Sequence, residues 1–263
     1  MPSLTFVGLG LNDERGISLH GLERARAADL VLLEHYTNVM PGLSLESLGK
    51  LVGKEIRVVG RREVEDGREI LDAASRSEVA LLVAGDPFVA TTHVDLRLRA
   101  IKRGIRIEVV NAPSIISVAP GAVGLQNYKF GRSATITFPE PLSFVPYDVL
   151  RVNRDLRLHT LFFLDLRLEE GRFMRAGEAV RLLLEMEAQQ KGGVVSEGTL
   201  MVVLARAGSP SQIVRAGRAI QLADLDFGPP PHSLIVPGRL HFMEAEALVL
   251  IAGADEDLVR GCL

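Results

Sequence analysis

One apolar run, Val-Ala-Leu-Leu-Val-Ala at residues 79–84, ends abruptly in the turn Gly85-Asp86-Pro87. Strands buried on both faces of a sheet read as continuous apolar runs, and this one is followed by a predicted helix at 94–102 and a predicted strand at 105–110. Strands separated by helices favour a parallel sheet, because parallel neighbours need a long return path. Ligands of such sheets bind beyond the carboxyl ends of the strands, so the turn is a predicted ligand site.

The rest of the first half repeats this alternation in short segments. Apolar runs predict strands at residues 4–9, 30–34 and 55–59. Helical spacing predicts helices at 18–28, with Ser18 as the N-cap, and at 67–77. We therefore expect an α/β fold with a mainly parallel sheet in the N-terminal part of the chain.

A proline-rich stretch, Pro139-Glu140-Pro141 followed by Pro146, comes after a predicted strand at 133–138. Proline lacks the backbone N–H group, so we expect no central strand or helix to continue through it. We place a boundary there and predict two α/β domains, residues 1–138 and 139–263. Strands then follow one another with fewer helices between them, which predicts a mixed sheet. The predicted strands lie at 160–166, 199–205, 213–220 and 233–236, and the predicted helices at 176–190 and 243–250.

Charge and cysteine content narrow the function classes. The net charge of -3 gives no global attraction to nucleic acid, so no direct binding of nucleic acid is expected. The single cysteine, Cys262, provides no disulfide framework, which fits a reducing cytoplasm. No uncharged apolar stretch approaches about 18 residues and no basic leader precedes the first strand, so we expect neither a membrane span nor a signal peptide.

Two glycines, Gly8 and Gly10, close the first predicted strand. The dinucleotide-binding fingerprint needs a third glycine where this chain has Asp13, and its helix follows the loop directly, whereas here the helix starts near Ser18. Glu34 stands about where a ribose-binding acid would lie, but it does not make up for the missing third glycine and the late helix start of the dinucleotide-binding fingerprint. Two interpretations stay open: the glycines let a ligand approach the backbone closely, or they form a packing turn.

Polar residues follow the next two predicted strands in the same way. Asp86 stands at the mouth of a buried strand, where a carboxylate is costly unless it has partners, although a plain turn with a solvated Asp is the alternative. The strand at 105–110 leads into Asn111-Ala112-Pro113-Ser114, in which Ser114 can cap the following helix. Three loops thus point to one edge of the predicted sheet.

The histidines and serines give no further catalytic pattern. None of the 6 histidines stands at a metal-ligand spacing from another, so no metal is expected. His232, which Pro229-Pro230-Pro231 holds before an apolar strand, is either a structural histidine or a site residue. Ser196 and Ser209 lack the setting of a hydrolase nucleophile, and we assign no catalytic residue.

Several segments together resemble the diphthine synthase family, within the tetrapyrrole methylase-like class of S-adenosylmethionine-dependent methyltransferases. They are FVGLGLNDERGISLHGLERARAADLVLLEHYT, VAGDPFVATTH, NAPSIISVAPGAVGLQNYKFG, LARAGSPSQIVRAGR and PPHSLIVPGRLHFMEAEAL. The GxG and GDP pieces are common to the whole class, whereas the ERG, EHYT and NYKFG pieces are specific to the diphthine branch. The resemblance covers essentially the whole chain.

The resemblance implies a two-domain tetrapyrrole methylase-like fold with the cofactor in the interdomain cleft. It implies S-adenosyl-L-methionine as the methyl donor, with S-adenosyl-L-homocysteine as the product. By matching segments it also implies a set of cofactor-binding residues from both domains. They are Leu11, Asp86, Val89, Ser114, Ile115, Leu166, Ala207 and His232.

The resemblance further implies a homodimer that methylates a protein substrate. The reaction is successive N-methylation of the 3-carboxy-3-aminopropyl-histidine intermediate on translation elongation factor 2, in diphthamide biosynthesis, which archaeal members carry to the trimethylated amine. We expect arginines at the rim of the site, Arg61 and Arg62 or those at 97–103, to help recognise this factor; the alternative is that these charges only form a solvated face. The alternatives are a tetrapyrrole or corrinoid precursor methyltransferase of the same fold and a non-catalytic adapter.

Overall fold

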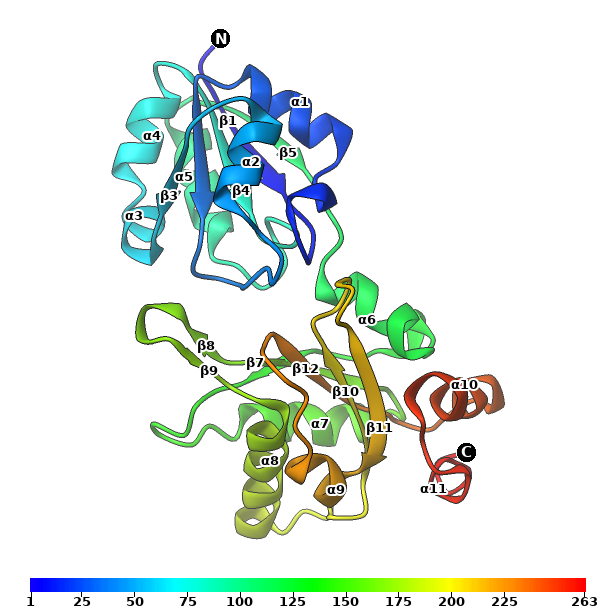
Figure 1. The fold of residues 1–263 in the computed structure, drawn as a ribbon. Coiled ribbons are helices and arrows are strands. Elements are labelled where there is room, and N and C mark those ends of the chain that lie inside the picture. Colours follow the sequence, from blue (N-terminus) through cyan, green and yellow to red (C-terminus); the bar gives the residue numbers. More distant parts are fainter. The chain divides into compact units, whose positions relative to one another are not determined.

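The structure, a computed structural model, describes residues 1–263 and divides into two compact units, residues 1–115 and 116–263 (Figure 1). This division comes earlier in the chain than the boundary predicted from the prolines at 139–146. The physical reason is the short strand β6 (Ala134–Ile136), which pairs in parallel with β7 (Thr160–Leu164) and so belongs to the sheet of the second unit. Each unit has its own sheet.

The sheet of the first unit is entirely parallel. Its strands stand in the order β3-β2-β4-β1-β5, and all four pairings between neighbours are parallel, as the alternating sequence predicts. The strands are β1 (Ser3–Gly8), β2 (Leu30–Glu34), β3 (Ile56–Val59), β4 (Glu78–Val83) and β5 (Arg106–Val110). Because every strand runs the same way, all five carboxyl ends meet at one edge of this sheet.

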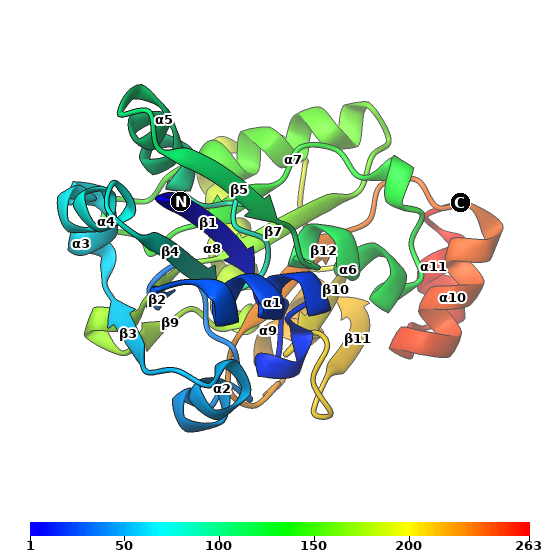
Figure 2. The ribbon, with the colours of Figure 1, turned by 90° about the horizontal axis from the view of Figure 1, so that it is seen from above.

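Helices cover both faces of this sheet, as Figure 2 shows from above. The helices are α1 (Leu19–Ala27), α2 (Leu45–Val52), α3 (Arg61–Asp66), α4 (Arg68–Ala74) and α5 (His93–Lys102), with a 3-10 turn, η1, at Glu14–Gly16. One buried apolar cluster joins α1 and α2 to one face, and a second joins α3, α4 and α5 to the other. Ser18 caps α1 as predicted, since its hydroxyl accepts a hydrogen bond of 3.0 Å from the Gly21 N–H group. The helices α2 and α3 were not predicted.

The second unit has a mixed sheet, as predicted. Its order is β11-β10-β12-β7-β6, with β6 and β7 parallel and the other neighbours antiparallel. The remaining strands of this sheet are β10 (Leu200–Ala205), β11 (Ile213–Arg218) and β12 (His232–Val236). A separate two-stranded sheet pairs β8 (Leu166–Arg167) with β9 (Arg172–Phe173), so the strand predicted at 160–166 is in fact interrupted at Asp165.

Helices α7, α8 and α9 pack on one face of the mixed sheet in a single buried cluster. The helices of this unit are α6 (Ile115–Val123), α7 (Val145–Asp155), α8 (Ala176–Gln190), α9 (Ala219–Asp224), α10 (Phe242–Ala252) and α11 (Glu256–Arg260), with 3-10 turns η2 (Asn127–Lys129) and η3 (Leu168–Glu170). The expectation that no helix could form through Pro146 is wrong. Pro146 lies in the first turn of α7, where its missing N–H group would have no helical partner anyway. No helix combines the length and the continuous apolar sequence that a membrane span requires.

Candidate functional site

Two glycine loops pair with each other at the carboxyl edge of the parallel sheet. The Gly85 N–H group donates to the Gly10 carbonyl over 2.7 Å, and the Gly10 N–H group donates back to the Gly85 carbonyl over 3.3 Å. Both residues have left-handed backbones, with φ +76° at Gly10 and +72° at Gly85, which glycine adopts without strain. The loops after β1 and β4 are therefore fixed together.

Asp86 joins the third loop to this pair. One of its carboxylate oxygens accepts hydrogen bonds from the Asn111 side-chain amide at 2.9 Å and from the Ala112 N–H group at 3.3 Å. The other oxygen accepts from the Phe88 N–H group at 3.0 Å. The side chain is buried, so the alternative of a solvated carboxylate in a plain turn does not hold. Asp86 acts as the common acceptor for the loops that follow β4 and β5.

The four other residues predicted for this unit lie next to these loops. Leu11 follows the paired Gly10, and the Val89 N–H group donates to the Asp86 carbonyl at 3.3 Å. Ser114 is buried, and Ile115 begins α6. Leu11, Val89 and Ile115 are only partly buried. The structure thus brings the predicted residues of the first unit to one sheet edge, with apolar side chains beside a buried carboxylate.

A buried pair that the sequence analysis missed supports the loop after Asp86. His93, at the start of α5, donates from Nδ1 to the Pro87 carbonyl at 2.9 Å, and its Nε2 lies 3.9 Å from the Glu34 carboxylate. Glu34 in turn accepts hydrogen bonds of 2.7 Å from the Tyr36 and Thr37 N–H groups. The Glu34 carboxylate therefore closes a turn, and its position does not serve a ribose. No pattern in the sequence marks His93, because its partners are backbone groups and a residue of another strand.

In the second unit, three predicted residues lie at one edge of the mixed sheet. Strands β7 and β10 end at this edge and β12 begins there, because β12 is antiparallel to both. Leu166 follows β7, Ala207 follows β10, and His232 opens β12 directly opposite Ala205. The strand directions thus bring together residues from three distant parts of the sequence, and we call this edge the 166/207/232 edge.

The His232 ring is fully engaged by backbone groups. Its Nδ1 accepts from the Ala176 N–H group at 3.2 Å, and its Nε2 donates to the Pro229 carbonyl at 3.2 Å. Burial holds the pKa of His232 below its ordinary value, which keeps the ring neutral. The ring therefore ties the start of α8 to the start of β12, and only its faces or its backbone remain for a ligand.

Arg206 shapes the neighbouring loop and was also missed. It is buried, has a left-handed backbone with φ +50°, and donates from its guanidinium group to the Phe227 and Pro229 carbonyls at 2.6 Å each. Ala207 therefore follows a fixed corner. The structure brings together no group of three or more His, Cys, Asp or Glu side chains that could hold a metal ion.

Comparisons with known proteins agree with this architecture. The sequence model of the family Tetrapyrrole (Corrin/Porphyrin) Methylases matches residues 3–223. A diphthine synthase of Methanosarcina mazei is 46% identical over 98% of both chains, and one of Methanosarcina acetivorans is 48% identical over 95% of this chain and 96% of its own. A crystal structure of diphthine synthase has a TM-score of 0.89 with 39% identity and covers 98% of both chains.

Proposed function

Because the chain belongs to the tetrapyrrole (corrin/porphyrin) methylase family and, within it, to the diphthine synthases, we infer that it is an S-adenosylmethionine-dependent methyltransferase that makes diphthine. The observation that carries this inference is a match of 46% and 48% identity over nearly the whole length of two diphthine synthases. A shared fold alone would not suffice, since one fold hosts many functions.

The cofactor-binding residues that we propose are the two sets at the sheet edges. In the first unit they are Leu11, Asp86, Val89, Ser114 and Ile115, and in the second Leu166, Ala207 and His232. S-adenosylmethionine combines an apolar adenine and thioether region with polar amine, carboxylate and ribose groups. Partly exposed apolar side chains beside fixed backbone groups and a carboxylate fit such a molecule.

S-adenosylmethionine supplies a methyl group on a positively charged sulfur, already activated for transfer to an amine. Each transfer would exchange the carbon–sulfur bond of the donor for a carbon–nitrogen bond on the amine, and the electron pair of the broken bond would stay on the sulfur. The amine must be neutral before it attacks, so it first gives a proton to solvent or to a nearby acceptor. The task of the chain is to hold the amine in line with the methyl group and to exclude water, which requires no strong acid or base.

We propose that the substrate is the 3-carboxy-3-aminopropyl group on one histidine of translation elongation factor 2, that the enzyme works in the cytoplasm, and that it is a homodimer. The names of the relatives support the substrate, because diphthine is the product of methylating this group. The competing proposal is methylation of a tetrapyrrole or corrinoid precursor, which the family description includes.

Methylation of the purified factor tests the function. Elongation factor 2 carrying the unmethylated intermediate is incubated with the enzyme and S-adenosylmethionine, and the modified peptide is weighed by mass spectrometry. We expect a gain of one or more methyl groups, and none on a factor with the unmodified histidine. No gain, or faster methylation of a free tetrapyrrole, would transfer the assignment to the competing substrate class.

Substitution of Asp86 tests the cofactor residues independently of the substrate. Asp86→Asn turns one acceptor oxygen into an N–H donor facing other N–H donors, which disturbs the loops after β4 and β5. We expect the affinity for S-adenosylhomocysteine, measured by calorimetry, to fall about tenfold or more. Asp72→Asn, on the exposed face of α4, is the control and should bind normally. Equal binding by both variants would remove Asp86 from the site.

A further inference from the structure

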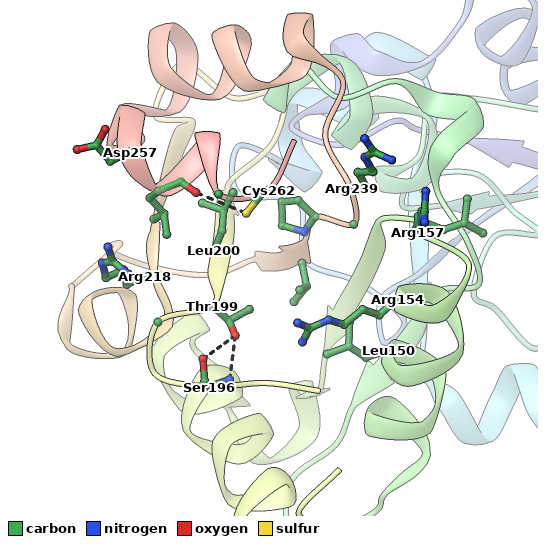
Figure 3. Close-up of a pocket in the computed structure, with 17 residues that line it drawn as sticks. Leu150, Arg154, Arg157, Ser196, Thr199, Leu200, Arg218, Arg239, Asp257 and Cys262 are labelled. Atoms are coloured by element: carbon green, nitrogen blue, oxygen red, sulfur yellow. Dashed lines mark hydrogen bonds between the residues drawn. The ribbon is translucent and has the colours of Figure 1, made fainter. Parts of the chain in front are cut away.

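A pocket lies at the edge of the mixed sheet opposite the 166/207/232 edge. It has a volume of about 750 Å³ and is lined by the segments that surround the starts of β7 and β10 and the ends of β11 and β12 (Figure 3). Strand β7 has five residues at roughly 3.3 Å each, so this edge lies about 16 Å from the 166/207/232 edge. The pocket is therefore separate from the proposed cofactor residues of this unit.

The pocket combines an apolar floor with a cationic rim. Leu150, Leu200, Val236 and Leu258 line it and are all buried. Four exposed arginines also line it, against one acidic residue, Asp257. The arginines are Arg154, Arg157, Arg218 and Arg239. A volume of this size is typical of sites for small molecules.

Three of these arginines have no partner within the protein. The guanidinium groups of Arg157, Arg218 and Arg239 make no hydrogen bond or ion pair, whereas Arg154 donates to the Val194 carbonyl. The carboxylate that could neutralise them, Asp257, instead lies 3.4 Å from another arginine of α11. The rim therefore carries uncompensated positive charge, which an anion would relieve.

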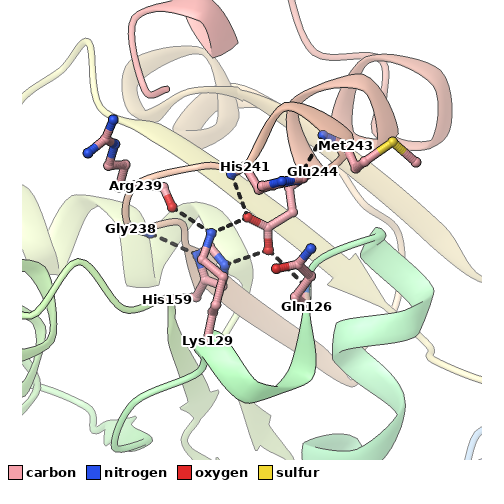
Figure 4. Close-up of polar contacts among 8 residues, drawn as sticks. All are labelled: Gln126, Lys129, His159, Gly238, Arg239, His241, Met243 and Glu244. Atoms are coloured by element: carbon pink, nitrogen blue, oxygen red, sulfur yellow. Dashed lines mark hydrogen bonds and ion pairs between the residues drawn. The ribbon is translucent and has the colours of Figure 1, made fainter.

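A buried polar cluster fixes the loop that carries Arg239 (Figure 4). The Gly238 N–H group donates to His159 Nδ1 at 3.0 Å, and Lys129 Nζ donates to the Arg239 carbonyl at 2.7 Å. His159 in turn donates from Nε2 to the Glu244 carboxylate at 2.9 Å. Arg239 is thus attached to a backbone that buried hydrogen bonds hold in place.

The same loop is packed against the backbone that carries Arg157. A Cβ atom at Gly238 would lie 2.6 Å from the carbonyl oxygens of Arg157 and Leu158, so only glycine fits there. Arg157 itself has a left-handed backbone with φ +61°, a conformation that costs a residue with a side chain about 1 kcal/mol. Two of the unpaired arginines therefore start from backbones in close contact.

We propose that this pocket binds an organic phosphate, with the phosphate at the arginine rim and an apolar or aromatic body on the leucine and valine floor. The planar guanidinium group of arginine can donate two parallel hydrogen bonds to phosphate oxygens. Three unpaired guanidinium groups carry more positive charge than the single carboxylate of Asp257 could neutralise. The floor favours a ligand with an apolar body over free phosphate, because burying apolar surface adds to the affinity. The proposal does not depend on the methyl-transfer reaction.

Calorimetry with phenyl phosphate as the probe tests the pocket at low ionic strength. We expect phenyl phosphate to bind the full-length protein at least about tenfold more tightly than inorganic phosphate, and phenol not to bind at concentrations up to about 10 mM. The affinity for S-adenosylhomocysteine should not change when the probe is present. No binding of phenyl phosphate, or competition between the two ligands, would overturn the proposal.

Arginine variants test where the probe binds. Arg218→Gln together with Arg239→Gln should weaken phenyl phosphate binding at least about tenfold, because two guanidinium groups are lost from the rim. Arg215→Gln is the matched control, since Arg215 lies on the same strand as Arg218, is exposed and unpaired, and does not line the pocket. Equal weakening of phenyl phosphate binding by the control would also overturn the proposal. So would unchanged phenyl phosphate binding by the double variant, including the case in which that variant loses only its self-association.

Discussion

Gly8 has no space for a side chain. A Cβ atom there would lie 2.6 Å from the Cβ of Ala112 and 2.7 Å from the carbonyl oxygen of Gly85, on the two neighbouring loops. Both distances are too short for packed atoms, so one loop would have to move. We expect Gly8→Ala to weaken S-adenosylhomocysteine binding about tenfold or more in calorimetry, because Asp86 and Ser114 lie on the displaced loops.

Gly85→Ala is the control for this substitution. A Cβ atom at Gly85 would meet only the Cβ of Ser114, at 4.0 Å, so the variant adds left-handed strain of about 1 kcal/mol without a collision. The Gly85→Ala variant should unfold at a slightly lower temperature than the natural protein. It should bind S-adenosylhomocysteine more tightly than Gly8→Ala does. The reverse order of affinities would mean that the contact among the three loops does not matter for binding.

At the scale of single residues, the sequence predicted positions better than it predicted partners. The run before Gly85 places Asp86 at the mouth of a buried strand, but only the fold shows that the carboxylate accepts from Asn111. His232 illustrates the same limit, since the carbonyl of Pro229 is local whereas the Ala176 N–H group is contributed by a distant helix. Hydrogen-bond partners that are distant in the chain cannot be predicted, because no regular spacing in the sequence connects them.

The start of helix α10 carries a carboxylate, Glu244, with a strongly lowered pKa. Burial alone would raise the pKa of Glu244, but hydrogen bonds from the His241 N–H group, Lys129 and the Gln126 N–H group outweigh it and lower the pKa from 4.5 to about 2. Burial also holds the pKa of its partner His159 below the ordinary value. Both groups therefore bind protons more readily in the unfolded chain.

This arrangement predicts how stability depends on pH. A depressed pKa contributes stability above the unfolded value, and that contribution is lost as the pH falls through the folded value. We expect the free energy of unfolding to decline below about pH 6.5 as His159 favours the unfolded state, and further between about pH 5 and pH 2 through Glu244. Glu244→Gln should lose roughly 3 kcal/mol at pH 7 in urea denaturation, and the loss should shrink toward pH 2.

Glu246→Gln provides the comparison on the same helix. Glu246 is exposed and makes no hydrogen bond, so its replacement should change stability little at any pH. A loss for Glu244→Gln that stays constant from pH 7 to pH 2 would indicate lost packing and not a lost ionised carboxylate.

Helices and strands were predicted where periodicity is strong and missed where local chemistry decides. The helix at 176–190 has the predicted bounds. The helix α7 was missed because Pro146 was read as a break, although proline suits the first turn. The boundary predicted at 138/139 puts the three-residue strand β6 in the N-terminal domain, whereas β6 pairs with β7, since a strand's sequence does not specify its neighbour.

At the scale of the whole molecule, the cofactor residues could not be inferred from spacing. Those of the second unit follow β7, follow β10 and open β12, and they become neighbours only because β12 runs antiparallel to the other two strands. Resemblance to a family carries such information, because it transfers positions that the fold has already brought together. The residues themselves remain a prediction that the substitutions at Asp86 and Gly8 test.

The arginines that were expected to recognise elongation factor 2 differ in their position relative to the Asp86 loop. Arg61 and Arg62 follow the carboxyl end of β3, at the same sheet edge as the Asp86 loop, and Arg61 stacks over Tyr36 at 5.1 Å. Arg97 likewise stacks over Phe88 of that loop at 5.2 Å. Arg99 and Arg103 lie farther along α5 and form ion pairs within the unit. Arg61 also pairs with Glu65, at 3.5 Å, so position and not the absence of an ion pair favours the first three arginines for docking the factor.

Charge reversal at Arg61 and Arg62 tests their role in the methylation of elongation factor 2. We expect Arg61→Glu together with Arg62→Glu to raise the KM for elongation factor 2 about tenfold and to leave S-adenosylhomocysteine affinity unchanged. Added salt should weaken methylation of the natural protein in the same way, because exposed charges are screened whereas buried cofactor contacts are not. Arg76→Glu reverses an exposed, unpaired arginine that precedes β4 at the opposite sheet edge, and it should not affect the KM. If all three proteins methylate the factor equally at every salt concentration, recognition must depend on uncharged surface, and these arginines only solvate the face on which they lie.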